Sequence, residues 1–318
     1  MHIRIGFDIT IACDVATPVL LALFPHPHEE ARIESDDGVV IVPDQMPDIF
    51  FDEFGNRRAR IVARPGETTF HFDAIAYDSG EPDAVAPDAR QHAIEELPFD
   101  ALRFLQPSRY CESDLLADEA WTRFGAIEGG WARVQAICDF VHEHIAFGYQ
   151  HARKDRTALE AFREGKGVCR DFAHLVVAFC RAMNIPARYA TGYLGDIGVP
   201  PAGPGDFSAW VDVFVGGRWH TVDARHNVPR IGRIVMARGR DAGDVPIIAS
   251  FGATRLLRFE VVTDQVVEET AEMGAGFAFA DEDDLEPLFR PAVVPSPAIA
   301  GTAGVPIMMS SSMGGGSA

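Results

Sequence analysis

One helix that is apolar around most of its circumference constrains the fold of this chain more than any other feature. It begins at Cys169, just after Gly165 and Gly167, and stops before Asn184-Ile185-Pro186. A helix with apolar residues on nearly every side must be enclosed by other elements. The chain must therefore pack further helices or strands around these apolar positions: Phe172, Leu175, Val176, Phe179, Ala182 and Met183.

The first 77 residues predict a β-rich domain. Every second residue from Ile3 to Ile11 is apolar, as in a half-buried strand. Further short strands are predicted at 19–24, 39–42, 49–54, 59–63 and 68–77, and Gly55-Asn56 suits a hairpin turn. Short strands at this spacing are typical of a sandwich. We assign residues 1–90 to an N-terminal β-sandwich-like domain and its linker.

Helical patterns begin near residue 98. Ser113 is a candidate cap for a first helix, an apolar stripe from Trp131 to Ile145 predicts a second, and Thr157 with Glu160 has the form of a capping box.

Strands are predicted again after the central helix, at 188–194, 209–215, 218–223 and 256–262. We assign residues 91–290 to an α+β core with closing C-terminal strands. The segment 291–318, which is rich in small residues, is expected to be a disordered tail.

Charge and cysteine content exclude several classes of function. A formal net charge of −19 argues against nucleic acid and anionic membranes as partners, because both require clustered Lys and Arg. The five cysteines are widely spaced and form no C-x-x-C pair, so we expect neither disulfides nor a metal site, and no cofactor. No apolar run is long enough to span a bilayer. These observations predict a soluble protein of the reducing cytoplasm.

Cys169 occupies the first turn of the central helix. Unpaired backbone N–H groups and the positive end of the helix dipole meet there, which favours a thiolate and offers donors to an oxyanion. The alternative is that Cys169 is a small buried hydrophobe, as expected for Cys138 and Cys180.

A predicted hairpin brings two further positions together. If Gly216-Gly217 is its two-residue turn, Val215 pairs with Arg218, and Trp210 lies opposite Asp223. Residues 208, 210 and 223 then share one face. A histidine at 208 would be oriented by Asp223, but position 208 is serine. Asp223 has the alternative role of bonding a turn.

Three segments in this order resemble the transglutaminase-like superfamily: Gly167-Val168-Cys169-Arg170-Asp171-Phe172-Ala173, Phe207-Ser208-Ala209-Trp210, and Trp219 to Asn227. The resemblance covers about residues 110–250, and the first part of the chain resembles the bacterial transglutaminase N-terminal region. It implies a papain-like core with a Cys-His-Asp triad. Cys169 then matches the nucleophile and Asp223 the orienting acid, while Ser208 takes the position of the histidine.

Other residues could complete such a site. His226 lies just past the predicted strand, where the chain can turn, and is a candidate substitute base; its alternative is a loop histidine bonded to nearby backbone. Tyr149 or Gln150 could supply a second oxyanion donor. Trp210 could contact substrate or pack beside the cleft. His220 should point to the opposite face of its strand.

The resemblance implies a cysteine peptidase or amidase that acts on peptide or Gln-type amides by thioester acyl transfer. The alternative is a catalytically impaired protein that uses the cleft to bind a peptide or protein partner, because a site without the histidine lacks its general base. The choice between hydrolysis and transamidation, and the oligomeric state, stay open.

Overall fold

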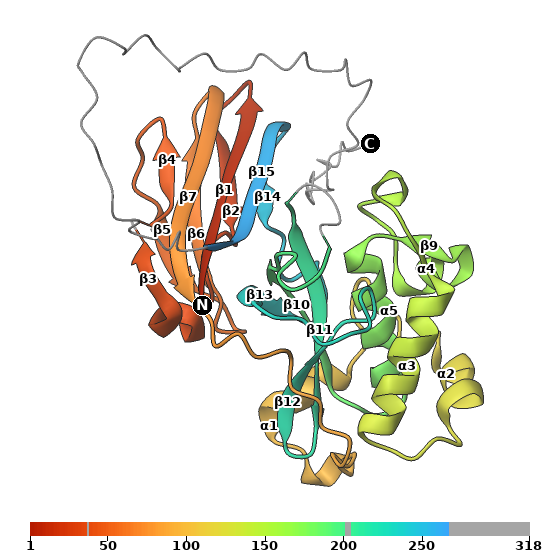
Figure 1. Ribbon diagram of the computed structural model, residues 1–318. Helices are drawn as coiled ribbons and strands as arrows, with labels where there is room; N and C mark the ends of the chain where they lie inside the picture. The colour runs from red at the N-terminus through yellow and green to blue at the C-terminus, as the bar shows by residue number, and fades with distance from the viewer. Residues whose placement is uncertain (37, 201–204, 267–318) are drawn as a thin grey trace, which may run out of the picture.

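The computed structural model describes residues 1–36, 38–200 and 205–266. The expected α+β fold is present, with an N-terminal sandwich on one side and a helical core on the other (Figure 1). The tail expected at 291–318 lies outside the described residues, as do residues 267–290 of the expected core and residues 201–204.

Two antiparallel sheets form the sandwich. The first has the order β15-β1-β7-β3, with β4 also paired to β7, and the second has the order β14-β2-β6-β5. Apolar side chains of both sheets, Ile5 and Phe72 among them, share one buried cluster. The strands are β1 (His2–Cys13), β2 (Thr17–Leu21), β3 (Ile33–Asp36), β4 (Val40–Val42), β5 (Asp48–Phe51), β6 (Arg57–Ala63), β7 (Gly66–Tyr77), β14 (Ile248–Ser250) and β15 (Arg255–Val266).

The C-terminal strands complete the sandwich, whereas we expected them to close the core. Strand β15 pairs with β1, with Phe7 opposite Val261, and β14 pairs with β2. The alternation of residues in a strand shows which face is buried but does not identify the neighbouring strand. The chain therefore returns to its N-terminal half after residue 247, across the boundary that we placed at residue 90.

The core is built on a sheet of order β12-β11-β10-β13. Helix α5 packs on β10 and β11, and α2, α3 and α4 gather around it on the same side, whereas the sandwich lies on the opposite side (Figure 1). Its elements are α1 (Phe99–Leu102), α2 (Ala117–Phe124), α3 (Trp131–His144), β8 (Ala146–Phe147), α4 (Ala158–Glu164), β9 (Lys166–Gly167), α5 (Cys169–Ala182), β10 (Ala187–Tyr193), β11 (Phe207–Val215), β12 (Arg218–Val222) and β13 (Ile234–Gly239).

The register of the predicted hairpin is confirmed. Val215 pairs with Arg218, and the ladder continues to Val211 opposite Val222. Gly216 and Gly217 both have positive φ, at 59° and 82°, as a two-residue turn requires. Position 223 therefore follows β12 where we expected it.

One of the two predicted helix caps is present. Thr157 Oγ1 accepts the Glu160 N–H at 3.3 Å, and Glu160 Oε2 accepts the Thr157 N–H at 3.0 Å, so the capping box of α4 is complete. The prediction for Ser113 is wrong, because α2 begins only at Ala117 and has Leu116 at its N-cap position.

Phe207 joins the two halves of the molecule. Its ring lies 6.0 Å from that of Phe7 in β1, 5.8 Å from that of Phe259 in β15 and 5.2 Å from that of Tyr193 in β10. The start of β11, which carries Ser208, is therefore held between sandwich and core.

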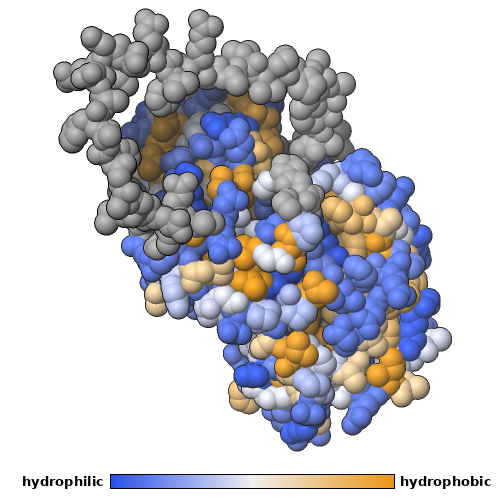
Figure 2. Space-filling view, in the orientation of Figure 1, coloured by the Kyte–Doolittle hydropathy of each residue, from blue (hydrophilic) through white to orange (hydrophobic). Residues whose placement is uncertain are grey.

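On the face of the molecule in Figure 2, hydrophilic residues are interspersed with small hydrophobic patches.

Candidate active site

The turn before α5 is built to present Cys169. Asp171, which is fully buried, accepts the Val168 N–H at 2.9 Å and an Arg156 N–H at 3.0 Å. A side chain at Gly167 would meet Asp171 at 2.6 Å, so only glycine fits there. These contacts fix the backbone at Val168 and leave Cys169 as the first residue of the helix, where its N–H has no intrahelical acceptor.

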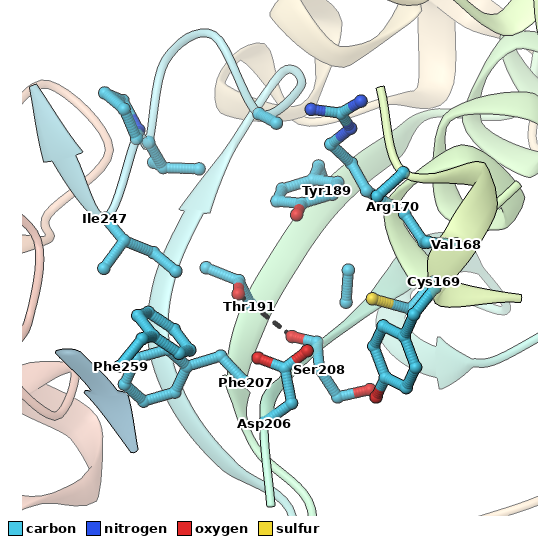
Figure 3. A pocket seen from close by; sticks show the side chains of 16 residues that line it. Val168, Cys169, Arg170, Tyr189, Thr191, Asp206, Phe207, Ser208, Ile247 and Phe259 are labelled. Atoms are coloured by element: carbon cyan, nitrogen blue, oxygen red, sulfur yellow. Dashed lines mark hydrogen bonds between the residues drawn. The ribbon is translucent and has the colours of Figure 1, made fainter. Parts of the chain in front are cut away.

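Cys169 faces a cavity of about 80 Å³ at the junction of the two halves, which we call the thiol cavity. Its walls come from the core, the segment before β14, and β15 (Figure 3). Most of its side chains are apolar or aromatic. Its lining includes Tyr149, Cys169, Asp206, Phe207, Ser208, Ile247 and Phe259. An apolar cavity beside a nucleophile is a common form of ligand site.

The thiol of Cys169 is held in its protonated form. Burial raises its pKa to about 11, and the carboxylate of Asp206 adds to this effect. Arg225 and a backbone hydrogen bond at Ala209 act in the opposite direction but do not offset it. The position at the helix N-terminus therefore does not by itself produce the thiolate that we expected there.

Asp223 is a buried carboxylate with cationic partners. Its Oδ2 accepts hydrogen bonds from His226 Nδ1 at 2.9 Å and from Arg233 Nη2 at 3.0 Å, and its Oδ1 accepts the Arg225 N–H at 3.0 Å. Burial alone would raise the pKa of Asp223, but Arg233 and His226 hold it well below its usual range. Asp223 therefore stays ionised and can orient an imidazole.

His226 turns back onto Asp223, as a substitute base would need to do. The bond to Asp223 places a proton on Nδ1 and leaves Nε2 as the acceptor in the neutral ring. His226 lines a second cavity of about 360 Å³, the histidine cavity, which shares Tyr149, Asp206 and Ser208 with the thiol cavity. Cys169 lines the thiol cavity and not the histidine cavity, so Cys169 and His226 line different cavities that share three residues.

Ser208 lies at the position that the resemblance assigns to the histidine, between the two cavities. Only 4% of it is exposed, its Oγ is buried without a hydrogen-bond partner, and its carbonyl accepts the Thr191 hydroxyl at 2.9 Å (Figure 3). A hydroxyl here cannot deprotonate a thiol, because it is a far weaker base than imidazole.

Asp206 was not predicted from the sequence. It lines both cavities, and its Oδ1 is buried without a hydrogen-bond partner. Burial raises the pKa of this carboxyl group to about 7, against weaker opposing effects of the Phe207 backbone and Arg225. The available signal in the sequence was that Asp206 lies two residues before Ser208. This signal was not sufficient, because Asp206 follows a Gly/Pro loop, where no pattern predicts the direction of a side chain.

The three residues expected to contact substrate separate in the structure. Tyr149 lines both cavities. Gln150 is exposed, lies within 3.4 Å of His151 Nε2 and lines neither cavity. Trp210 is 1% exposed and stacks on the Arg233 guanidinium at 4.9 Å, so it supports Asp223 from behind and does not face the cavities.

The other histidines near the site have structural contacts. His174 accepts the Ala242 N–H at 3.1 Å and stacks on Tyr110. His220 lies opposite Val213, contacts Trp131 and lines neither cavity. Among the residues that the structure describes, no group of three or more His, Cys, Asp or Glu could hold a metal ion, and no helix has the length and apolarity to cross a membrane.

Comparisons with known proteins identify the fold of the core. Residues 123–224 match the family description "Transglutaminase-like superfamily". A crystal structure from Cytophaga hutchinsonii, described as a putative cysteine protease, superposes with a TM-score of 0.71 at 28% identity, over 89% of this chain and 95% of that one.

Two curated relatives share parts of the sequence. The uncharacterized protein ML0607 of Mycobacterium leprae is 36% identical over 122 residues, which are 36% of this chain and 41% of that protein. The human kyphoscoliosis peptidase is 31% identical over 182 residues, which are 54% of this chain and 25% of that protein. The chain thus spans less than half the length of each. The family match and the superposition show that residues 123–224 form a transglutaminase-like core.

Proposed function

We propose that the protein is a cysteine peptidase or amidase that acts on peptide or Gln-type amides by acyl transfer through Cys169. The observation that carries the proposal is the placement of the Cys169 thiol at the first turn of α5, inside a cavity that also contains Ser208 and adjoins the Asp223–His226 pair. The thiol attacks the amide carbonyl, the amine leaves, and water or a second amine resolves the thioester.

Two donors are available to the oxyanion. The Cys169 N–H is free of the helix ladder, and the Tyr149 hydroxyl belongs to a side chain that lines both cavities. Burial raises the pKa of Tyr149, so its hydroxyl keeps its proton and can donate. The proposed substrate is a peptide or a protein. The proposed location is a reducing compartment such as the cytoplasm, because all five cysteines are free.

A second candidate function is peptide or partner binding without turnover. The raised pKa of Cys169 and the serine at 208 favour it, because general acid–base catalysis contributes about 10²–10⁴ in rate and its usual residue is missing.

A search with a peptide library separates the two functions. Products are read by mass spectrometry, ammonia release is followed for Gln peptides, and Cys169→Ala is the matched control. Turnover that this variant lacks supports the peptidase or amidase. Peptide binding with equal affinity by both proteins, and no cleavage or deamidation, would favour the binding function. Ser208→His restores the family histidine and should raise turnover in either case.

A further inference from the structure

Two buried polar atoms at the boundary between the cavities have no partner. Asp206 Oδ1 and Ser208 Oγ are both buried without a hydrogen bond among the described residues. An unpaired buried carboxyl oxygen costs more than an unpaired hydroxyl, and such groups in native proteins call for a functional explanation. Both atoms line the cavity that contains the nucleophile.

Asp206 is also the charged residue that shifts the pKa of the Cys169 thiol most. Among the charges around Cys169, the carboxylate of Asp206 acts on it most strongly. In Figure 3 the side chains of Asp206, Ser208 and Cys169 lie around one space, with Asp206 and Ser208 coming from the same stretch of chain. Asp206 directly precedes β11, and both Asp206 and Ser208 line the same two cavities. The side chain of Asp206 is longer than that of Ser208. Its carboxyl group can therefore act in the space that an imidazole at 208 would fill.

We propose that the Asp206 carboxyl group is the acid–base catalyst of this site, in place of the histidine that position 208 lacks. The proposal rests on the acyl transfer through Cys169 described above. Asp206 takes the proton of the Cys169 thiol as the sulfur–carbon bond forms. It gives that proton to the leaving nitrogen as the carbon–nitrogen bond breaks. It then takes a proton from the water or amine that attacks the thioester, and it returns that proton to the thiolate as the sulfur–carbon bond breaks.

The surroundings of Asp206 suit a group that changes protonation state near neutral pH. Burial raises the pKa of Asp206 to about 7. The titratable and charged groups that share its cavities are Cys169 and Arg170 on α5, Tyr149 in the loop before α4, Tyr189 on β10, Asp196 after β10, Arg225 and His226 after β12, and Asp264 on β15. Among them Arg225 alone lowers the pKa of Asp206, and it does not cancel the effect of burial.

The test compares an amide with an activated ester. A benzyloxycarbonyl-dipeptide p-nitroanilide needs its nitrogen protonated on leaving, whereas p-nitrophenolate leaves the matching ester without help. Asp206→Asn should lower kcat/KM for the anilide by about 10²–10⁴ and leave the ester rate equal or higher. It should also remove the inflection near pH 7 from the anilide profile. Asp264→Asn is the matched control, because Asp264 is exposed and lines the histidine cavity but not the thiol cavity.

Each other outcome overturns the assignment. An equal loss on both substrates means a structural role for Asp206, and no loss on the anilide means that it is not the acid. If His226→Gln shows the anilide-selective loss and Asp206→Asn does not, His226 is the base. If the protein without substitutions hydrolyses the ester but not the anilide, the acid–base role of Asp206 is contradicted, whereas thioester chemistry at Cys169 is supported. Failure of both substrates to acylate Cys169 above the Cys169→Ala level removes the proposed function itself.

Discussion

The reactivity of the Cys169 thiol can be worked out from its surroundings. With a pKa of about 11, the thiol is ionised far less at neutral pH than a free cysteine with a pKa of about 8.5. At about pH 7.5 the thiolate population is then about 300-fold smaller than that of the free thiol. A thiolate of higher pKa is intrinsically more nucleophilic, and with a Brønsted coefficient of about 0.45 this recovers roughly 13-fold. Iodoacetamide should therefore modify Cys169 about 20-fold more slowly than N-acetylcysteine.

The assay follows the modified peptide by mass spectrometry from acid to alkaline pH, with N-acetylcysteine in the same tube. Cys111, Cys138 and Cys180 are internal controls, because burial raises the pKa of each and they are buried. They should stay unmodified in the folded protein, whereas Cys169 is partly exposed in its cavity and should react as the pH approaches 11.

Ser208→His gives the contrasting case. An imidazole at 208 would line the thiol cavity with Cys169 and the histidine cavity with His226, and could form an ion pair with the thiolate. The alkylation profile should then move to lower pH, and modification at about pH 6 should rise at least tenfold. The reasoning would be refuted if Cys169 of the protein with Ser208 reacted as fast as free cysteine at about pH 7.5. A cation beside the sulfur would then have to stabilise the thiolate.

Three further measurements test the structure around the site. Asp171→Ala removes the acceptor of the Val168 N–H and one of the partners of Arg156, which keeps Glu164 and the His151 carbonyl, and should lower the free energy of unfolding by about 1–3 kcal/mol, as measured in urea; an unchanged free energy would mean that the turn before α5 does not depend on Asp171. Thr157→Ala removes the cap of α4 and should cost about 1 kcal/mol in thermal unfolding, and an unchanged midpoint would contradict the capping role. The folded pKa of Asp206, about 7, exceeds the unfolded value of about 4, so its contribution to stability is present below about pH 4 and is lost as the pH rises through 7. Asp206→Asn should abolish this part of the pH dependence in urea titrations at about pH 5 and pH 8; identical pH dependence in both proteins would show that Asp206 titrates normally.

Local patterns predicted the parts of the site that depend on neighbouring residues. The first turn of α5 at Cys169 and the register of the Gly216-Gly217 hairpin follow from apolar periodicity and turn chemistry, which act over a few residues. The return of His226 to Asp223 was possible to anticipate because the chain leaves the strand at that point.

Long-range packing decided what the sequence did not show. The residues of β15 would show the same alternation in either sheet. The alternation therefore could not predict that β15 pairs with β1. Asp206 lines the thiol cavity together with Phe259 from β15 and with Ile247, which are distant from it in the sequence. Its raised pKa is therefore a product of tertiary structure, and no motif around residue 206 carries it.

The two pKa values at the site also set how fast the proposed reaction can be. A thiol with a pKa of about 11 and a carboxyl group with a pKa of about 7 differ by about four units, so the thiolate paired with protonated Asp206 makes up only about 10⁻⁴ of the resting site. A histidine at 208 would hold much more of the site as an ion pair, because imidazolium stabilises a thiolate and a neutral carboxyl group does not. Binding energy from an apolar substrate group in the thiol cavity could offset part of this deficit by excluding water and strengthening the oxyanion bonds. Turnover should therefore be slow on small amides and rise with the length of apolar peptide that fills the cavity, a dependence that kcat/KM for a series of Ala-, Val- and Leu-containing peptides measures directly.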